Sequence, residues 1–262
     1  MMRDLTITSV DQLTLFNITG GAYRCTVDEL QNVSIAQSEE KSDITGKQGR
    51  KLSSLKRNKA VTVSGTNGLV SGGLLELQTG NTFENKAVKV LWTDYLTVQS
   101  NAATTTWKAV GTSGAEIEAL YTISDGALAT KLVQDSTAAS GKFAYTPGTK
   151  ALTFSGIADG TEIMVVYKRN ITADVLENKS DKYSEKCVMY IDATAEDKCG
   201  NLYHVQFYFP KADFSGEFTM EMGDNQTVHN FEAEALAGAC GSGGNLWTYV
   251  VFGANTEDTA IA

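Results

Sequence analysis

The chain has two histidines, His204 and His229, that could act as the base of a hydrolase. A Ser-His-Asp triad needs a nucleophile, a histidine and an orienting carboxylate at one site. His204 falls within a predicted strand and His229 beside another, and the sequence contains no G-x-S-x-G motif. We therefore expect both histidines to be ordinary packed or surface residues, and no catalytic residue is predicted.

Paired carboxylates could instead make a glycosidase, because that reaction needs two acids on either side of the scissile bond. Several acids lie on predicted strands near the end of the chain: Glu217, Glu221, Glu232 and Glu234. With 31 acids in the chain, such a pair is expected by chance. The three tryptophans (Trp92, Trp107 and Trp247) stand singly, in patterns that suit core burial more than sugar stacking. The sequence therefore favours a protein that is not an enzyme.

Metal and phosphate sites have little support. The four cysteines are dispersed, and we expect free thiols. Asp192, Glu196 and Asp197 could bind calcium around a hairpin connection, but a solvated turn is favoured because the spacing is not that of an EF hand. The glycine-rich stretches at 65–73 and 238–244 lack the Gly-Lys-Ser/Thr signature of a phosphate loop. No metal or cofactor is predicted.

The one unusual local feature is a run of cations without an acid between Gly46 and Lys59. Its members are Lys47, Arg50, Lys51, Lys56, Arg57 and Lys59. The chain carries a net charge of −9, so removing these six positive charges leaves −15 on the rest. The segment is predicted to be a loop that leads into a strand at 60–64.

Three interpretations fit this basic loop: an arm that contacts phosphates, a docking surface for an acidic partner, or a solvated loop. It lacks interleaved aromatic residues, which disfavours stacking on single-stranded nucleic acid. Docking is favoured, because a basic loop that meets the acidic surface of another copy gives head-to-tail contacts, which close into rings or propagate.

The rest of the pattern is mainly β. Alternating apolar residues predict strands at 86–99 and 162–167, hairpins at 142–154 and 187–209, and a closing apolar strand at 246–252. A further apolar face is predicted from Phe218, Met220 and Met222. Residues 72–79 are expected to form a short helix. Residues 101–170 are predicted to be an inserted Ig-like β module, and residues 1–100 plus 171–262 the main β domain.

Composition sets further limits. Apolar residues make up 42% and charged residues 20% of the 262 residues, which is ordinary for a chain that folds. No run of about 18 apolar residues is present, and the start lacks the apolar stretch of a signal peptide. We therefore expect no membrane insertion and a cytoplasmic site of synthesis and assembly.

Two segments resemble the major tail tube proteins of tailed bacteriophages. The first, Asp43 to Gln78, joins the long basic loop to a strand and the short helix; the second, Tyr203 to Cys240, contains FPKADFSGE and leads to the final strands. The intervening β module, with its Tyr-Thr-Pro-Gly turn and DGTEIMVVY strand, is similar to Ig-like insertions in phage virion proteins. The resemblance is one of layout and covers most of the chain.

This resemblance implies a two-sheet β sandwich or barrel of tail tube type, with a flanking helix and an inserted Ig-like module. It also implies rings of six subunits, stacked into a hollow tube that belongs to the virion tail and is assembled in the host cytoplasm. The partners would be the chain itself and other tail proteins, while genomic DNA would pass through an acidic lumen without specific binding. Residues 38–59 match the loop that reaches the next ring, so the six cations become the expected inter-ring contacts.

Two alternatives remain open on the sequence. A capsid-decorating or receptor-binding virion protein would share the Ig-like module. A carbohydrate-binding β-sandwich adhesin would share the aromatic strands. Both would act as monomers that bind capsid or glycan rather than as subunits of a tube.

Overall fold

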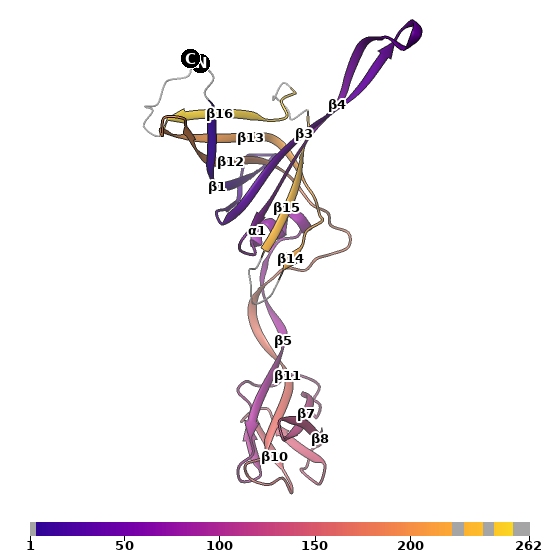
Figure 1. Cartoon of the computed structure of the whole chain (residues 1–262). Helices are drawn as coiled ribbons and strands as arrows, with labels where there is room; N and C mark the ends of the chain where they lie inside the picture. The colour runs from indigo at the N-terminus through magenta and orange to yellow at the C-terminus, as the bar shows by residue number, and fades with distance from the viewer. Residues whose placement is uncertain (1–3, 222–227, 238–243, 254–262) are drawn as a thin grey trace. The chain divides into compact units, whose positions relative to one another are not determined.

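The computed structural model describes residues 4–221, 228–237 and 244–253. The chain divides into two compact units: unit 1 runs to Phe83 and resumes at Leu176, and unit 2 comprises Glu84–Val175. Within the described residues the chain is mainly β with one short α-helix (Figure 1), which confirms the predicted fold class. No described helix is long and apolar enough to span a bilayer.

Unit 1 is an antiparallel sheet that curls into a half barrel. Its strands follow the order β2-β1-β12-β13-β15-β4-β3, with β14 beside β15 and β16 beside β13. Their bounds are β1 Leu5–Asn17, β2 Tyr23–Val27, β3 Leu30–Thr45, β4 Lys51–Asn67, β12 Lys186–Asp197, β13 Leu202–Phe214, β14 Met220–Glu221, β15 Val228–Ala235 and β16 Thr248–Gly253. The predicted hairpin at 187–209 is confirmed as β12 and β13. Met222 lies outside the described residues.

The predicted helix is confirmed as α1, Gly72–Thr79. Its first turn is capped by Ser71, whose hydroxyl accepts a hydrogen bond from the Leu74 amide. It ends at Gly80, which has a φ of 66° and lies so close to the Tyr183 backbone that a Cβ would clash there. Leu74 and Leu77 are buried in the core of unit 1, so the helix closes one side of the curled sheet.

His229 joins this helix to the sheet. Its Nδ1 accepts a hydrogen bond from the Ser71 amide at 3.3 Å, and its Nε2 lies 2.8 Å from Gln78 Oε1. Because Nδ1 accepts, the proton sits on Nε2 and is donated to Gln78. Burial lowers the pKa of His229. The residue is therefore a neutral structural histidine, as expected of a packed side chain.

Unit 2 is a second sheet in the order β5-β11-β7-β8-β9-β10-β6, in which β8 and β9 are parallel and the other pairs antiparallel. The bounds are β5 Glu84–Thr97, β6 Ala102–Thr104, β7 Ile117–Ser124, β8 Ala127–Gln134, β9 Lys142–Thr146, β10 Ala151–Phe154 and β11 Glu162–Val175. The predicted hairpin at 142–154 is confirmed as β9 and β10. Its core contains Phe143, Leu152 and Ile163. An Ig-like identity for residues 101–170 stays a prediction.

A buried carboxylate organises one end of unit 2. Asp94 accepts hydrogen bonds from the Tyr167 hydroxyl, the Thr106 amide and the Trp92 indole at 2.7, 2.7 and 2.9 Å. Burial raises the pKa of Asp94, but these three donors outweigh it and the net pKa is lowered. Desolvation by burial and the Asp94 hydrogen bond raise the pKa of Tyr167. Asp94 is thus an ionised structural group.

The tryptophans of unit 2 contradict the prediction of core burial. Trp92 and Trp107 are both exposed, and the guanidinium of Arg169 lies between them, 4.5 and 4.3 Å from the two ring centroids. A cation over an indole face is attracted by the ring quadrupole, which holds these side chains at the surface. Isolated tryptophans in a β pattern suggest core burial, because periodicity along the chain does not reveal a pairing with a distant arginine.

Candidate self-assembly surfaces

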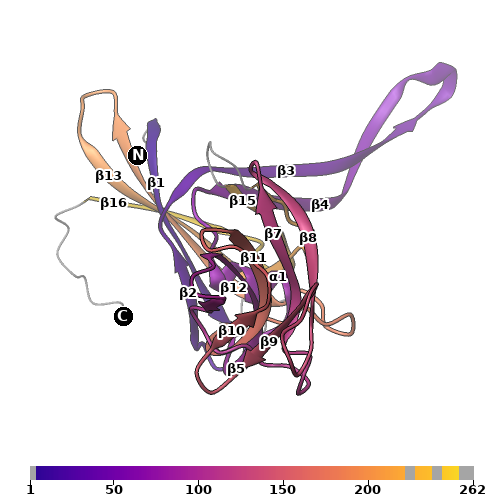
Figure 2. The same cartoon turned by 90° about the horizontal axis from the view of Figure 1, so that it is seen from below.

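Residues 51–59 of the basic segment begin the strand β4 of a long hairpin, so the prediction of a loop is wrong for them, whereas residues 46–50 form the turn of that hairpin. β3 and β4 pair continuously from the sheet to a turn at the 3-10 helix η1, Lys47–Gly49. β15 pairs only with residues 62–67 of β4, through its residues 229–234. Residues 38–60 of β3 and β4 therefore pair only with each other. We call residues 38–60 the arm; Figure 1 and Figure 2 both show it projecting beyond the sheet. The loop prediction failed because a ribbon exposed on both faces has no apolar alternation to detect.

Three of the six predicted cations are paired across the arm. Lys51 lies 2.7 Å from Asp43, Lys56 lies 2.6 Å from Glu39, and Arg57 lies 3.7 Å from Glu40. The hydrogen bond from Lys56 lowers the pKa of Glu39. These pairs are exposed to solvent and are worth little individually. A run of charges along one strand does not reveal these pairs, because the acids lie on the other strand of the hairpin.

The other three cations form no ion pair with any residue that the structure describes: Lys47, Arg50 and Lys59. Lys41 adds a fourth such cation, and it lies directly opposite Lys56 in the register. Like charges opposite one another weaken a hairpin. With seven cations and three acids, the arm carries a net charge of +4. An acidic partner surface would relieve this repulsion.

The charge on the rest of the molecule is strongly uneven. Unit 2 has nine acids and eight cations, a net charge of −1. Since the whole chain carries −9, the part of unit 1 outside the arm carries −12. The two-signed character inferred from the sequence is therefore a property of unit 1, in which a basic arm extends from an acidic body.

The arm also exposes three apolar side chains that no sequence motif marks. Ile44, Leu52 and Leu55 have 52%, 67% and 54% of their surface exposed. Ile44 and Leu55 lie on the same face, because Ile44 pairs with Ser53 and Ser42 with Leu55. Leu52 packs against the backbone of Gly46 at the turn. An exposed apolar group at the end of a ribbon without a core is typical of a surface that a partner covers.

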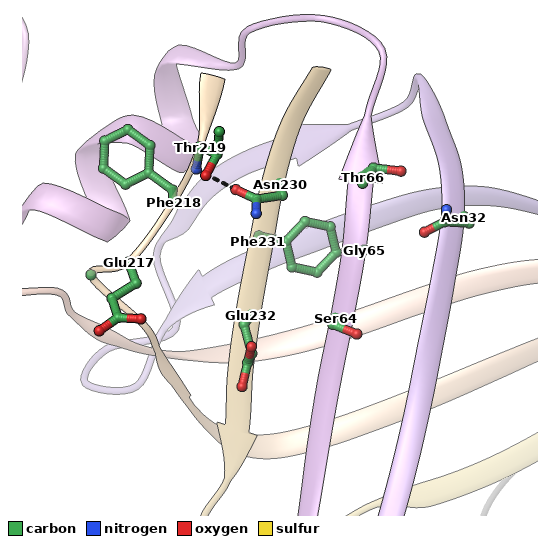
Figure 3. Close-up of a pocket in the computed structure, with 11 residues that line it drawn as sticks. Asn32, Ser64, Gly65, Thr66, Glu217, Phe218, Thr219, Asn230, Phe231 and Glu232 are labelled. Atoms are coloured by element: carbon green, nitrogen blue, oxygen red, sulfur yellow. Dashed lines mark hydrogen bonds between the residues drawn. The ribbon is translucent and has the colours of Figure 1, made fainter. Parts of the chain in front are cut away.

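A polar groove of about 570 Å³ crosses the outer face of β15, β4 and β3. Figure 3 shows it between the 216–219 segment and the strands, where Asn230 accepts a hydrogen bond from the Thr219 amide at 2.5 Å. Two of the predicted strand acids, Glu217 and Glu232, line it; Glu221 and Glu234 do not. Its other polar lining residues are Asn32, Ser64 and Thr66. The grouping of two acids is thus real. Two aromatic residues also line the groove, of which Phe218 is partly exposed and Phe231 is almost fully buried.

An apolar groove of about 500 Å³ opens on the inner side of the curled sheet. It is lined by Ile7, Val10, Val33, Ile35, Gln37, Ile191, Ala193, Phe207 and Trp247. The Trp247 indole lies 3.4 Å from Gln37 Oε1, to which it donates a hydrogen bond. Ile7 at the rim is 47% exposed. The groove therefore presents aliphatic and aromatic surface to solvent within the described part of unit 1.

β16 is an apolar strand at the margin of the sheet. The predicted closing strand is confirmed, but its side chains Tyr249, Val250, Val251 and Phe252 are all exposed. Consecutive residues point to opposite faces, so neither face of β16 is covered by the described residues. Such an edge strand is a template for pairing with another chain.

Around Asp192 the outer face of β1, β12 and β13 is polar, and further along the strands the rings of Phe16, Tyr190 and Tyr208 lie on the same face. Asp192 lies between Gln12 and Gln206, whose side-chain amides donate to its two oxygens at 2.9 and 2.8 Å. β1 contains no lysine or arginine, and neither do residues 188–197 of β12 or 202–210 of β13. His204 lies on this face and stacks on Phe252.

The calcium alternative gains no support from the geometry. Among the described residues, no group of three or more acids, histidines or cysteines is placed to hold a metal ion. Asp197 accepts hydrogen bonds from the Cys199 and Asn201 amides and so holds the β12–β13 turn. Cys25, Cys187 and Cys199 are free thiols; Cys240 and the stretch 238–243 lie outside the described residues.

The chain is similar in sequence to a known protein family. The sequence profile of the YomU/Tube protein family matches residues 5–248, which is most of the chain and includes both units. No curated protein matches the sequence significantly.

Proposed function

Because the chain belongs to the YomU/Tube family, a phage tube-type family, we propose that it is a tail tube subunit that forms hexameric rings stacked around a DNA-conducting lumen. The family assigns the protein to the phage tail tube and to assembly with itself and other tail proteins. We further propose the hexamer, the lumen and the roles of individual residues.

The observation that carries the proposal is the arm. A two-stranded ribbon is at best marginally stable by itself in water. This one carries a net charge of +4 and extends from a body of −12, with Lys47, Arg50 and Lys59 unpaired among the described residues. Its sign complements the body of another copy, and the arm and body are different surfaces, so contact between copies is head-to-tail. We assign the stacking contact between rings to the arm.

The part of the outer face of β1, β12 and β13 around Asp192 is polar and suits the wall of a DNA channel. Phosphate binding is driven largely by cations, and the described stretches of this face have none. The Asp192 carboxylate accepts hydrogen bonds from two side-chain amides rather than from a lysine or arginine. A duplex would slide along such a face without being retained. β16 supplies the open edge at which neighbouring subunits in one ring would pair.

Charge reversal of the unpaired cations tests the role of the arm. We expect the triple variant Lys47→Glu, Arg50→Glu, Lys59→Glu to keep the fold and form rings but not stacks, since opposite charges at the contact become like charges. The matched control is Lys89→Glu, Lys108→Glu, Lys131→Glu, which makes the same charge change at exposed positions of unit 2. Sedimentation velocity separates rings from stacks. Stacking of the arm variant as complete as that of the control would contradict the assignment.

A further inference from the structure

We infer that the apolar groove of unit 1 receives the end of the arm from a second copy of the chain, with Ile44, Leu52 and Leu55 seated against the groove. The inference rests on the proposed function and names the receiving site for its stacking contact. It assigns a role to two surfaces, the groove and the apolar end of the arm, that charge complementarity alone does not explain.

The groove is built to take apolar side chains. Eight of its nine lining residues are apolar, and the ninth, Gln37, is engaged by the Trp247 indole. The ring of Phe207 lies 6.1 Å from that of Trp247 and 5.0 Å from that of Tyr249, so the aromatic surface continues from the groove onto β16. Open apolar surface of this kind is stabilised when a partner removes it from water.

The end of the arm has matching chemistry. Ile44, Leu52 and Leu55 are each more than half exposed, although most other residues of the ribbon are charged or polar. The surrounding cations give the arm the opposite sign to the body that contains the groove. Long-range attraction would bring the arm to the body, and apolar burial would hold it there.

The arm of the same copy cannot fill the groove. Gln37 lines the groove, and Ile44 follows it by seven residues along a strand that stays paired with β4 to Thr45. At a rise of about 3.3 Å per residue, Ile44 lies about 23 Å further along the ribbon. Leu52 follows the turn and lies slightly further from the sheet than Ile44, because Ile44 pairs with Ser53. The occupant is therefore a second copy, and the contact is heterologous, which lets it propagate from ring to ring.

Photo-crosslinking from the arm tests this directly. Benzoylphenylalanine is placed at Leu52 in unlabelled full-length protein, which is mixed with ¹⁵N-labelled wild-type protein, allowed to assemble and irradiated. We expect crosslinks between unlabelled and labelled peptides that map to residues 7–10, 33–37 or 247. Crosslinks within one copy, to the polar groove or to unit 2 would overturn the inference. Assembled tubes with crosslinks elsewhere reject only this site, whereas absence of rings and tubes in the wild type rejects the proposed function itself.

Substitution of the arm gives an independent measurement. Leu52→Asp with Leu55→Asp alters only exposed side chains, so we expect an unchanged fold and at least a tenfold higher protein concentration for stacking. Leu128→Asp with Val133→Asp, both exposed on β8 of unit 2, is the matched control and should stack as the wild type does. On the groove side, Ile7→Asp should act like the arm variant. Wild-type stacking by the arm variant would refute the role of its apolar end.

Discussion

The strands β3 and β4 change character along their length, although the same hydrogen-bond ladder joins them throughout. Near the sheet, Val61 and Val63 are fully buried in the core of unit 1. On the arm, residues 38–60, no residue is buried. We call residues 61–67 of β4 the root. Burial of the root determines the stability of the fold, whereas the arm contributes charge and exposed apolar groups that become useful only when another molecule covers them. Folding and assembly can therefore be altered separately, by substitutions in the buried segment and on the arm.

The largest expected contrast is between a core residue at the root and an exposed residue on the arm. Phe231 packs on Phe214 and is almost fully buried next to the root of β4. We expect Phe231→Ala to lower the free energy of unfolding by about 3–5 kcal/mol, because it removes a large buried side chain. Leu55→Ala should change it by less than about 0.5 kcal/mol. Urea unfolding followed by circular dichroism measures both; equal losses would remove the distinction between root and arm.

Two glycines, Gly65 next to Phe231 and Gly46 at the turn of the arm, allow the same comparison of stability with smaller expected changes. A Cβ on Gly65 would meet the Phe231 ring at 2.7 Å and the Asn32 carbonyl at 2.8 Å (Figure 3). We expect Gly65→Ala to cost about 1–3 kcal/mol of stability through overpacking. Gly46→Ala meets only the Leu52 side chain, which is exposed and can rotate away, so thermal unfolding should change little. A comparable drop in melting temperature for both variants would show that the turn of the arm is as constrained as the root.

The smallest effect is the pH dependence at the root. Burial lowers the pKa of His229 below its value in the unfolded chain, so the unfolded state takes up the proton first as pH falls. The stability due to neutral His229 is complete above about pH 6.5 and is lost as the pH falls toward its folded pKa. We expect urea midpoints to decrease from pH 7.5 to pH 5, and His229→Gln to flatten that slope. His204→Gln should keep it; a wild-type slope in His229→Gln would contradict this role.

Sequence reasoning succeeded where a local signal is strong. The short helix was predicted at residues 72–79, where α1 lies, and the β9–β10 hairpin was predicted because Pro147 and Gly148 mark its turn. It failed where the cause is non-local. The ion pairs of the arm were not predicted because the partner strand supplies the acids, and the apolar groove gathers residues from β1, β3, β12 and β13 that are far apart in the chain. The exposure of β16 likewise could not be predicted from hydrophobicity, since an exposed apolar strand and a buried core strand have the same sequence pattern.

Electron microscopy of the purified full-length protein tests the central claim most directly. At rising protein concentration, negative-stain images should show rings of uniform bore and then tubes, with class averages in which the arm of each subunit contacts the adjacent ring. The variant reversed at Lys47, Arg50 and Lys59 should stop at rings. Particles that remain monomeric at every concentration, or tubes whose arms project freely into solvent, would contradict the account.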